Sequence, residues 1–158
     1  MPASCYLKST SFTGAFSTTA IKDLVKVTEV ESHDWGIGRV LDAATGTLAT
    51  KCVGYLLSVS FRSSIASGQL GKLMTNGTRI PSMELLVFDG NVEFPIQRLT
   101  FFDVGVEGLS VSSVVAGSSP PTETWSFSYR RVRATYIQLM PDGRTGPTIT
   151  TEVAIPNF

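Results

Sequence analysis

The sequence is poor in charged residues. Asp, Glu, Lys and Arg make up only 16% of its 158 residues, below the share of about a quarter that is usual for soluble domains. Thirteen basic residues balance thirteen acidic ones, so no net charge attracts nucleic acid or an anionic membrane over long range. The low charge predicts a surface that other subunits cover, with a Ser/Thr-rich β surface as the alternative.

Histidine and cysteine are also scarce, which disfavours most catalytic and metal sites. The one histidine, His33, stands beside Asp34, but adjacent residues on a strand point to opposite faces and are poorly placed to act as a catalytic pair. Cys5 and Cys52 predict buried free thiols of a reducing compartment. No zinc-ligand spacing, dinucleotide fingerprint, Walker sequence or nucleophile elbow is present. We therefore expect no cofactor and no enzymatic activity, the alternative being an enzyme whose site the sequence does not reveal.

No apolar run is long enough to span a bilayer, and Met1–Cys5 carries neither the basic nor the apolar region of a signal peptide. We expect a protein that does not insert into membranes. It would reside in the cytoplasm and leave the cell, if at all, by a route that reads no N-terminal signal.

Alternating apolar residues predict about eight or nine strands in a single domain over residues 1–158. The clearest alternation runs from Val53 to Phe61. The only helix expected is Ser67–Asn76, with Ser67 as N-cap and a Leu70, Leu73, Met74 stripe. We predict an all-β (mainly β) fold, a compact β-barrel with one short flanking helix. Separate strands are expected from Leu99 to Val106 and from Leu109 to Ala116.

The stretch Glu123–Leu139 carries the most informative pattern. Trp125, Phe127 and Tyr129 alternate with serines, and the apolar phase then moves by one residue at Arg130. A shift of one residue moves every later side chain to the opposite face. The pattern predicts a bulge or a strand that passes from one packing surface to another.

Two segments are candidate subunit-interface or lumen sites. Arg131 and Arg133 share one strand face, either as a solvated, ion-paired face or as an intersubunit or pore contact. Gly36–Thr50 is rich in Gly, Ala and Thr and predicts a long loop or a hairpin arm that a neighbouring subunit orders. The candidate residues in this arm are Ala43, Thr45, Gly46 and Leu48.

Several stretches are informative together. They are Tyr6–Lys8, Trp35-Gly36, Phe61–Val87, Leu109–Tyr136 and Gly146–Ile155. In their order and spacing over most of the chain, they resemble the Hcp family, the hemolysin-coregulated tube proteins of bacterial type VI secretion systems.

This resemblance implies a structural role in an injection machine. Family members form hexameric rings that stack into a hollow tube, which sheath contraction expels to deliver effectors. The implied partners are copies of the chain, the sheath, a VgrG-like spike, the baseplate, and effector proteins that the lumen holds and chaperones. Alternatives are a tail-tube protein of a phage or another contractile injection system, and a monomeric β-barrel that binds a small ligand.

Overall fold

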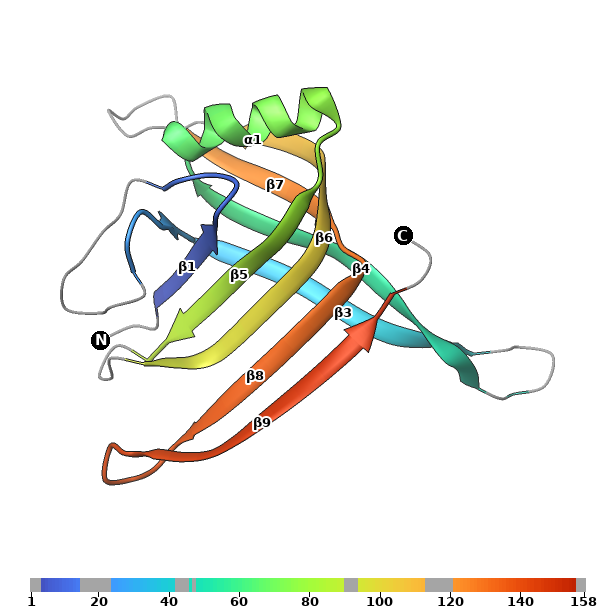
Figure 1. Ribbon diagram of the computed structural model, residues 1–158, viewed down its shortest axis with the longest axis vertical. Coiled ribbons are helices and arrows are strands. Elements are labelled where there is room, and N and C mark those ends of the chain that lie inside the picture. Colours follow the sequence, from blue (N-terminus) through green and yellow to red (C-terminus); the bar gives the residue numbers. More distant parts are fainter. Residues whose placement is uncertain are drawn as a thin grey trace.

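The computed structural model describes residues 4–14, 24–41, 46, 48–89, 94–112 and 121–155. Nine strands and one helix make up this part of the chain (Figure 1). In chain order they are β1 (Ser4–Ser9), β2 (Thr28–Glu29), β3 (Ser32–Leu41), β4 (Leu48–Arg62), α1 (Ile65–Asn76), β5 (Ile80–Phe88), β6 (Pro95–Ser112), β7 (Thr122–Ser128), β8 (Arg131–Leu139) and β9 (Thr145–Ala154).

The long strand β6 divides the sheet into two parts, and every strand pair is antiparallel. The first half of β6 pairs with β5 on one edge and with β8 on the other, whereas its second half pairs with β7. We call β2-β1-β5-β6-β8-β9 sheet I and β6-β7-β4-β3 sheet II. The prediction of separate strands at Leu99–Val106 and Leu109–Ala116 was wrong. The strand continues, with a register shift between Val106 and Gly108, because a bulge absorbs the change of phase.

The two sheets enclose the main hydrophobic core. Sheet I contributes a cross-strand row of Leu7, Leu85 and Leu99, and sheet II contributes a row of Val59 and Trp125; all five are buried. A smaller cluster on the opposite face of sheet I consists of Tyr6, Leu24, Val27, Leu86 and Phe88. Segment 24–29 therefore covers part of the outer face of sheet I.

The predicted all-β class with one short helix is confirmed, but no ladder in the described part closes the sheet into a complete barrel. The chain itself crosses the gap. Between β2 and β3, the Val30 backbone N–H donates to the Cys5 carbonyl in sheet I, and the Glu31 N–H donates to the Ser60 carbonyl in sheet II. These two bonds link the connection between β2 and β3 to β1 of sheet I and to β4 of sheet II.

The phase change at Arg130 marks the passage between the sheets, as predicted. Strand β7 ends at Ser128, which pairs with Gly105 in sheet II, and β8 begins at Arg131, which pairs with Phe102 in sheet I. Trp125, Phe127 and Tyr129 are fully buried before the break, and Val132 and Ala134 are buried after it. One continuous segment thus supplies core residues to both sheets.

The helix begins earlier than the sequence predicted. Its N-cap is Ser64, and Ser67 occupies the third helical position of a capping box. The Ser67 hydroxyl accepts from the Ser64 N–H at 3.0 Å, a task that Glu or Gln usually performs. The C-cap Gly77 has φ 66°, a left-handed conformation that favours glycine. Leu70 is buried, and the rest of the predicted stripe packs against the core.

The Gly36–Thr50 segment contains hairpin strand rather than only loop, in line with the second of the two sequence predictions. Its described residues lie in β3 and β4, apart from Gly46 between them. The Tyr55 ring of β4 lies over two glycines of β3. A Cβ on Gly36 would come within 3.1 Å of the ring, and one on Gly38 would lie 3.5 Å from its hydroxyl.

Candidate assembly surfaces

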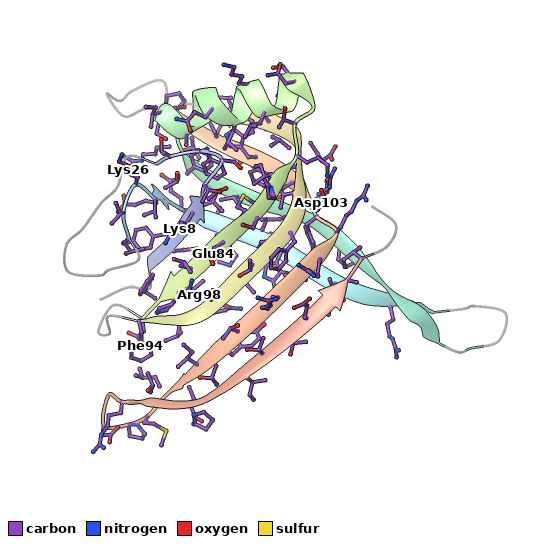
Figure 2. All side chains as sticks on the ribbon, in the orientation of Figure 1. Lys8, Lys26, Glu84, Phe94, Arg98 and Asp103 are labelled. Carbon is purple, nitrogen blue, oxygen red and sulfur yellow. The ribbon has the colours of Figure 1, made fainter. Side chains whose placement is uncertain are left out.

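The outer face of sheet I carries alternating charge. A row of paired positions runs across five strands through Lys8, Glu84, Thr100, Arg133 and Glu152. The neighbouring Arg98 binds Glu84, with Nη1 3.0 Å from Oε2. Figure 2 shows Lys8, Glu84 and Arg98 on the adjacent strands β1, β5 and β6. Much of this charge is therefore neutralised within the face.

Arg131 and Arg133, the predicted interface or lumen residues, both point to this face. They share one carboxylate, Glu152, at Nε–O distances of 3.4 and 2.9 Å. Both guanidinium groups also lie against the Phe102 ring, 4.1 and 5.2 Å from its centre, within the range of a cation–π contact. Each side chain remains 45% exposed. A partner protein can therefore reach both guanidinium groups, although they already contact Glu152 and Phe102 within the chain.

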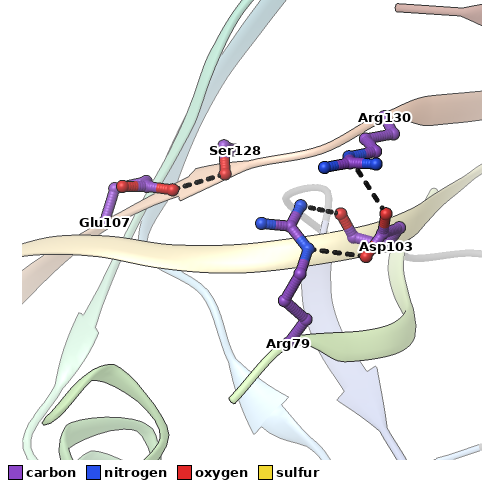
Figure 3. A network of polar contacts seen from close by, with 5 residues as sticks. All are labelled: Arg79, Asp103, Glu107, Ser128 and Arg130. Atoms are coloured by element: carbon purple, nitrogen blue, oxygen red, sulfur yellow. Dashed lines mark hydrogen bonds and ion pairs between the residues drawn. The ribbon is translucent and has the colours of Figure 1, made fainter. Parts of the chain in front are cut away.

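A polar network holds the two sheets together where β6 bends (Figure 3). Asp103 has φ 53°, a left-handed conformation that is rare outside glycine. Its carboxylate binds Arg79 at 2.6 Å and Arg130 at 3.1 Å, and its carbonyl accepts from Arg79. Beside it, the Ser128 hydroxyl donates to Glu107 at 2.6 Å. The network fixes the backbone at the point where β6 exchanges β8 for β7.

The outer face of sheet II differs in chemistry. Its central rows pair small and hydroxyl residues across β4, β7 and β6, and the Ser60 and Thr124 hydroxyls lie 2.8 Å apart. These rows are Ser58, Ser126 and Gly108, and Ser60, Thr124 and Ser110. Charge appears at the margins, on Asp34, Glu107 and the Arg62–Glu31 pair. These two rows are polar and uncharged, and the exposed Leu56 lies beyond Ser58 on the same face of β4.

Sheet II also has two edges without a ladder partner among the described residues. One is β3, which pairs only with β4. The other is the second half of β6, because β5 pairs with β6 only as far as Val104. Backbone N–H and C=O groups at such edges can hydrogen-bond to a strand of another chain and so extend the sheet.

His33 and Cys5 come together, which the sequence did not predict. His33 pairs with the core-facing Val59 and Asp34 pairs with Ser58, so the two neighbours do point to opposite faces. The Cys5 sulfur lies 3.7 Å from Nδ1 of His33. Burial raises the pKa of the Cys5 thiol to about 12. Partial desolvation lowers the pKa of His33, and the nearby negative charge of Asp34 only partly offsets this shift. Both shifts disfavour the thiolate–imidazolium pair that a cysteine nucleophile needs.

The described residues contain no group of three or more His, Cys, Asp or Glu side chains that could hold a metal ion. The helix in this part of the chain is not long and apolar enough to cross a membrane.

The arm residues are only partly described. Ala43 and Thr45 lie outside the described residues, as does the side chain of Leu48. Gly46 is exposed and has φ 68°. A role of these four residues in assembly stays a prediction, as does that of Arg131 and Arg133.

The family model described as "Type VI secretion system effector, Hcp" matches residues 6–136. The chain belongs to the Hcp family of type VI secretion tube proteins. No curated protein sequence matches this Hcp chain significantly.

Solved structures agree with the assignment to Hcp. A structure described as a type six secretion system protein has 26% identity and a TM-score of 0.82, and the match covers 94% of this chain and 92% of that one. Hcp1 from Salmonella typhimurium has 24% identity and a TM-score of 0.79, with 98% and 96% covered. Hcp3 from Pseudomonas aeruginosa has 15% identity and a TM-score of 0.60, with 99% of both chains covered. The last two matches bear on the fold alone.

Sequence reasoning missed the hydroxyl face and the Asp103 network of this Hcp chain. The signal for the face was present, because serines alternate with apolar residues both in Val53–Phe61 and in Glu123–Leu139. Only the pairing of β4 with β7 reveals that the two sets of serines form one surface. No sequence pattern indicated the left-handed backbone at Asp103.

Proposed function

We propose that this Hcp-family chain assembles into hexameric rings, which stack into a hollow tube that delivers effector proteins. The observation that carries the proposal is the architecture of sheet II. Its four strands are all antiparallel to their neighbours, and neither of its edges has a ladder partner among the described residues. Because four is an even number, β3 of one copy can pair with the second half of β6 of the next copy and continue the alternation. Repetition of one such head-to-tail contact closes a ring when its rotation brings the last copy back to the first.

In this arrangement the outer face of sheet II lines the lumen. Its central hydroxyl rows offer no fixed charge that would retain a cargo of opposite sign, although they can hydrogen-bond to it. The charged outer face of sheet I then points away from the lumen, toward the surrounding sheath. Arg131 and Arg133 would lie on that outward side, at a position from which they can also contact a neighbouring subunit.

The proposed role is structural and needs no catalytic residue. Its remaining partners are the contractile sheath, a VgrG-like spike, the baseplate, and the effectors that the lumen holds and chaperones. Rings would assemble in the cytoplasm and leave the cell with the tube. The β3–β4 arm, with Ala43, Thr45, Gly46 and Leu48, is proposed to contact the next ring. Deletion of residues 43–48 should then spare folding and weaken stacking, as electron micrographs of tubes would show.

Light scattering on the purified chain tests the ring. A mass near six chains supports it, whereas a monomer at high concentration contradicts it and favours a monomeric ligand-binding module.

Labelling tests the orientation of the subunit. In a chain with Cys5→Ser and Cys52→Ser, Ser126→Cys places a thiol on the hydroxyl face and Glu84→Cys places one on the charged face. In assembled tubes, a bulky polyethylene-glycol maleimide should modify the second variant and spare the first. Equal labelling after disassembly is the control, and preferential labelling of Ser126→Cys in tubes contradicts the orientation.

A further inference from the structure

The core-facing side of sheet I extends beyond the part that sheet II covers. One row of paired positions runs across the sheet through Val87, Gln97, Tyr136 and Ile149. Tyr136 points to the same face as Ala134, two residues earlier on β8. The exposed fraction nevertheless rises from 6% at Ala134 to 44% at Tyr136 and 65% at Ile149. The face that forms the core near the break at Arg130 is therefore open to solvent farther along the hairpin.

The uncovered part lies on the β8–β9 hairpin, whose turn projects at the end of the molecule opposite α1 (Figure 1). This face of the hairpin carries no charged side chain. Its residues are Val132, Ala134, Tyr136 and Gln138 on β8, and Ile149, Thr151 and Val153 on β9. The charges of the two strands, on Arg131, Arg133 and Glu152, occupy the opposite face, where both arginines pair with Glu152. The other two charges of the hairpin, Asp142 and Arg144, pair with each other at its turn. The exposed apolar side chains of the uncharged face are Tyr136 and Ile149, which are paired neighbours on the two strands. Adjacent apolar side chains that the subunit itself leaves uncovered are candidates for burial against another copy.

A second core face is uncovered in sheet II. On the second half of β6, Leu109 pairs with the fully buried Trp125, and Val111 pairs with the buried Glu123, so both point toward the core side. They are 42% and 54% exposed. Strand β6 runs toward the end of the molecule where α1 lies, away from the β8–β9 turn (Figure 1). Each copy thus presents two different open core faces, one from each sheet.

We propose that the β8–β9 hairpin of one copy packs its Tyr136–Ile149 face on the Leu109–Val111 face of the next copy. The contact repeats, between subunits, the packing of sheet I on sheet II within the subunit. The two patches differ, so the contact is head-to-tail and is compatible with ring closure. It also involves the same strand, β6, whose free edge would pair with β3 of the neighbouring copy. The inference rests on the proposed ring and specifies which side chains hold it together.

The experiment compares two surface variants of the full chain. Tyr136→Ser with Ile149→Thr removes apolar atoms that are exposed in the monomer, so the fold should persist. Thr150→Ala, on the opposite face of the same strand, is the control. In a dilution series followed by light scattering, rings of the double variant should dissociate at a concentration about tenfold or more above that of the wild type. Rings of the control should dissociate within about twofold of the wild-type concentration.

A charge pair keeps the test decisive if the double variant folds poorly. Ile149→Lys alone and Val111→Glu alone should each weaken the ring, and one chain that carries both should recover it, because each interface then joins Lys to Glu. If each single charged variant forms rings like the wild type, or if the chain with both charges fails to recover them, the proposed packing is overturned but the ring is not. A wild-type chain that stays monomeric overturns the proposed function and this contact together.

Discussion

Asp103 is expected to stabilise the junction of the two sheets through its carboxylate, at the expense of a strained backbone. Its φ of 53° costs an ordinary residue about 1–2 kcal/mol, whereas glycine adopts it freely and aspartate and asparagine tolerate it better than most residues do. Its two ion pairs involve side chains that are 39% to 61% exposed, so each contributes about 0–1 kcal/mol. Strain and ion pairing are therefore of similar size and can be separated by substitution.

Three variants separate them. Asp103→Ala loses both ion pairs and bears the full strain of an ordinary residue, so it should lower the free energy of unfolding by about 1–2 kcal/mol. Asp103→Gly loses the same pairs but relieves the strain, and should be more stable than Asp103→Ala by about 0.5–1 kcal/mol, less than the full strain because glycine is more flexible when unfolded. Asp103→Asn should lie between wild type and alanine.

Urea denaturation followed by tryptophan fluorescence measures these differences, since Trp125 is buried in the core next to the junction strand. The gap between wild type and Asp103→Asn should also shrink in about 1 M NaCl, where screening acts over roughly 3 Å. The reasoning is refuted if glycine is less stable than alanine, because backbone strain would then not govern this position.

Two further predictions concern stability. Burial raises the pKa of both Cys5 and Tyr129 to about 12, so above about pH 9 the unfolded chain loses protons that the folded chain keeps. The urea midpoint should be flat below about pH 8 and fall as pH rises toward 11; Cys5→Ala with Tyr129→Phe should flatten that fall, and an unchanged slope in this variant contradicts the assignment. Ser64→Ala removes only the N-cap and should cost about 1 kcal/mol. Ser67→Ala should cost about 1–2 kcal/mol, because Ser67 also donates to the buried Glu123. Thermal unfolding of the two variants measures both losses, and equal losses would mean that the bond to Glu123 adds nothing.

The fold class could be predicted because period-two alternation dominates the sequence. The phase change at Arg130 was also readable, since apolar residues occupy odd positions from Trp125 to Tyr129 and even positions from Val132 onward. The helix start was misplaced because Ser64 and Ser67 are equally good caps in isolation. Only the structure shows that the Ser67 hydroxyl belongs to the capping box, where it accepts from the Ser64 N–H and donates to Glu123.

The candidate surfaces were harder to predict because they depend on pairing between distant segments. Arg131 and Arg133 were found from their spacing, but their partner Glu152 follows only from the register of β8 with β9. Tyr136 continues the alternation of Val132 and Ala134, and this pattern alone would place it in the core. It is exposed instead because sheet II does not reach that far, a limit set by the relative extent of the two sheets and not by local sequence.

The central claim is a closed ring with sheet II on the inside. Electron cryo-microscopy of the purified, assembled chain tests it most directly. The account predicts sixfold rings in which Ser60, Thr124 and Ser126 line the lumen, while Glu84 and Arg133 lie on the outer surface. A ring with Glu84 and Arg133 on the lumen side, or particles no larger than one chain, would contradict it.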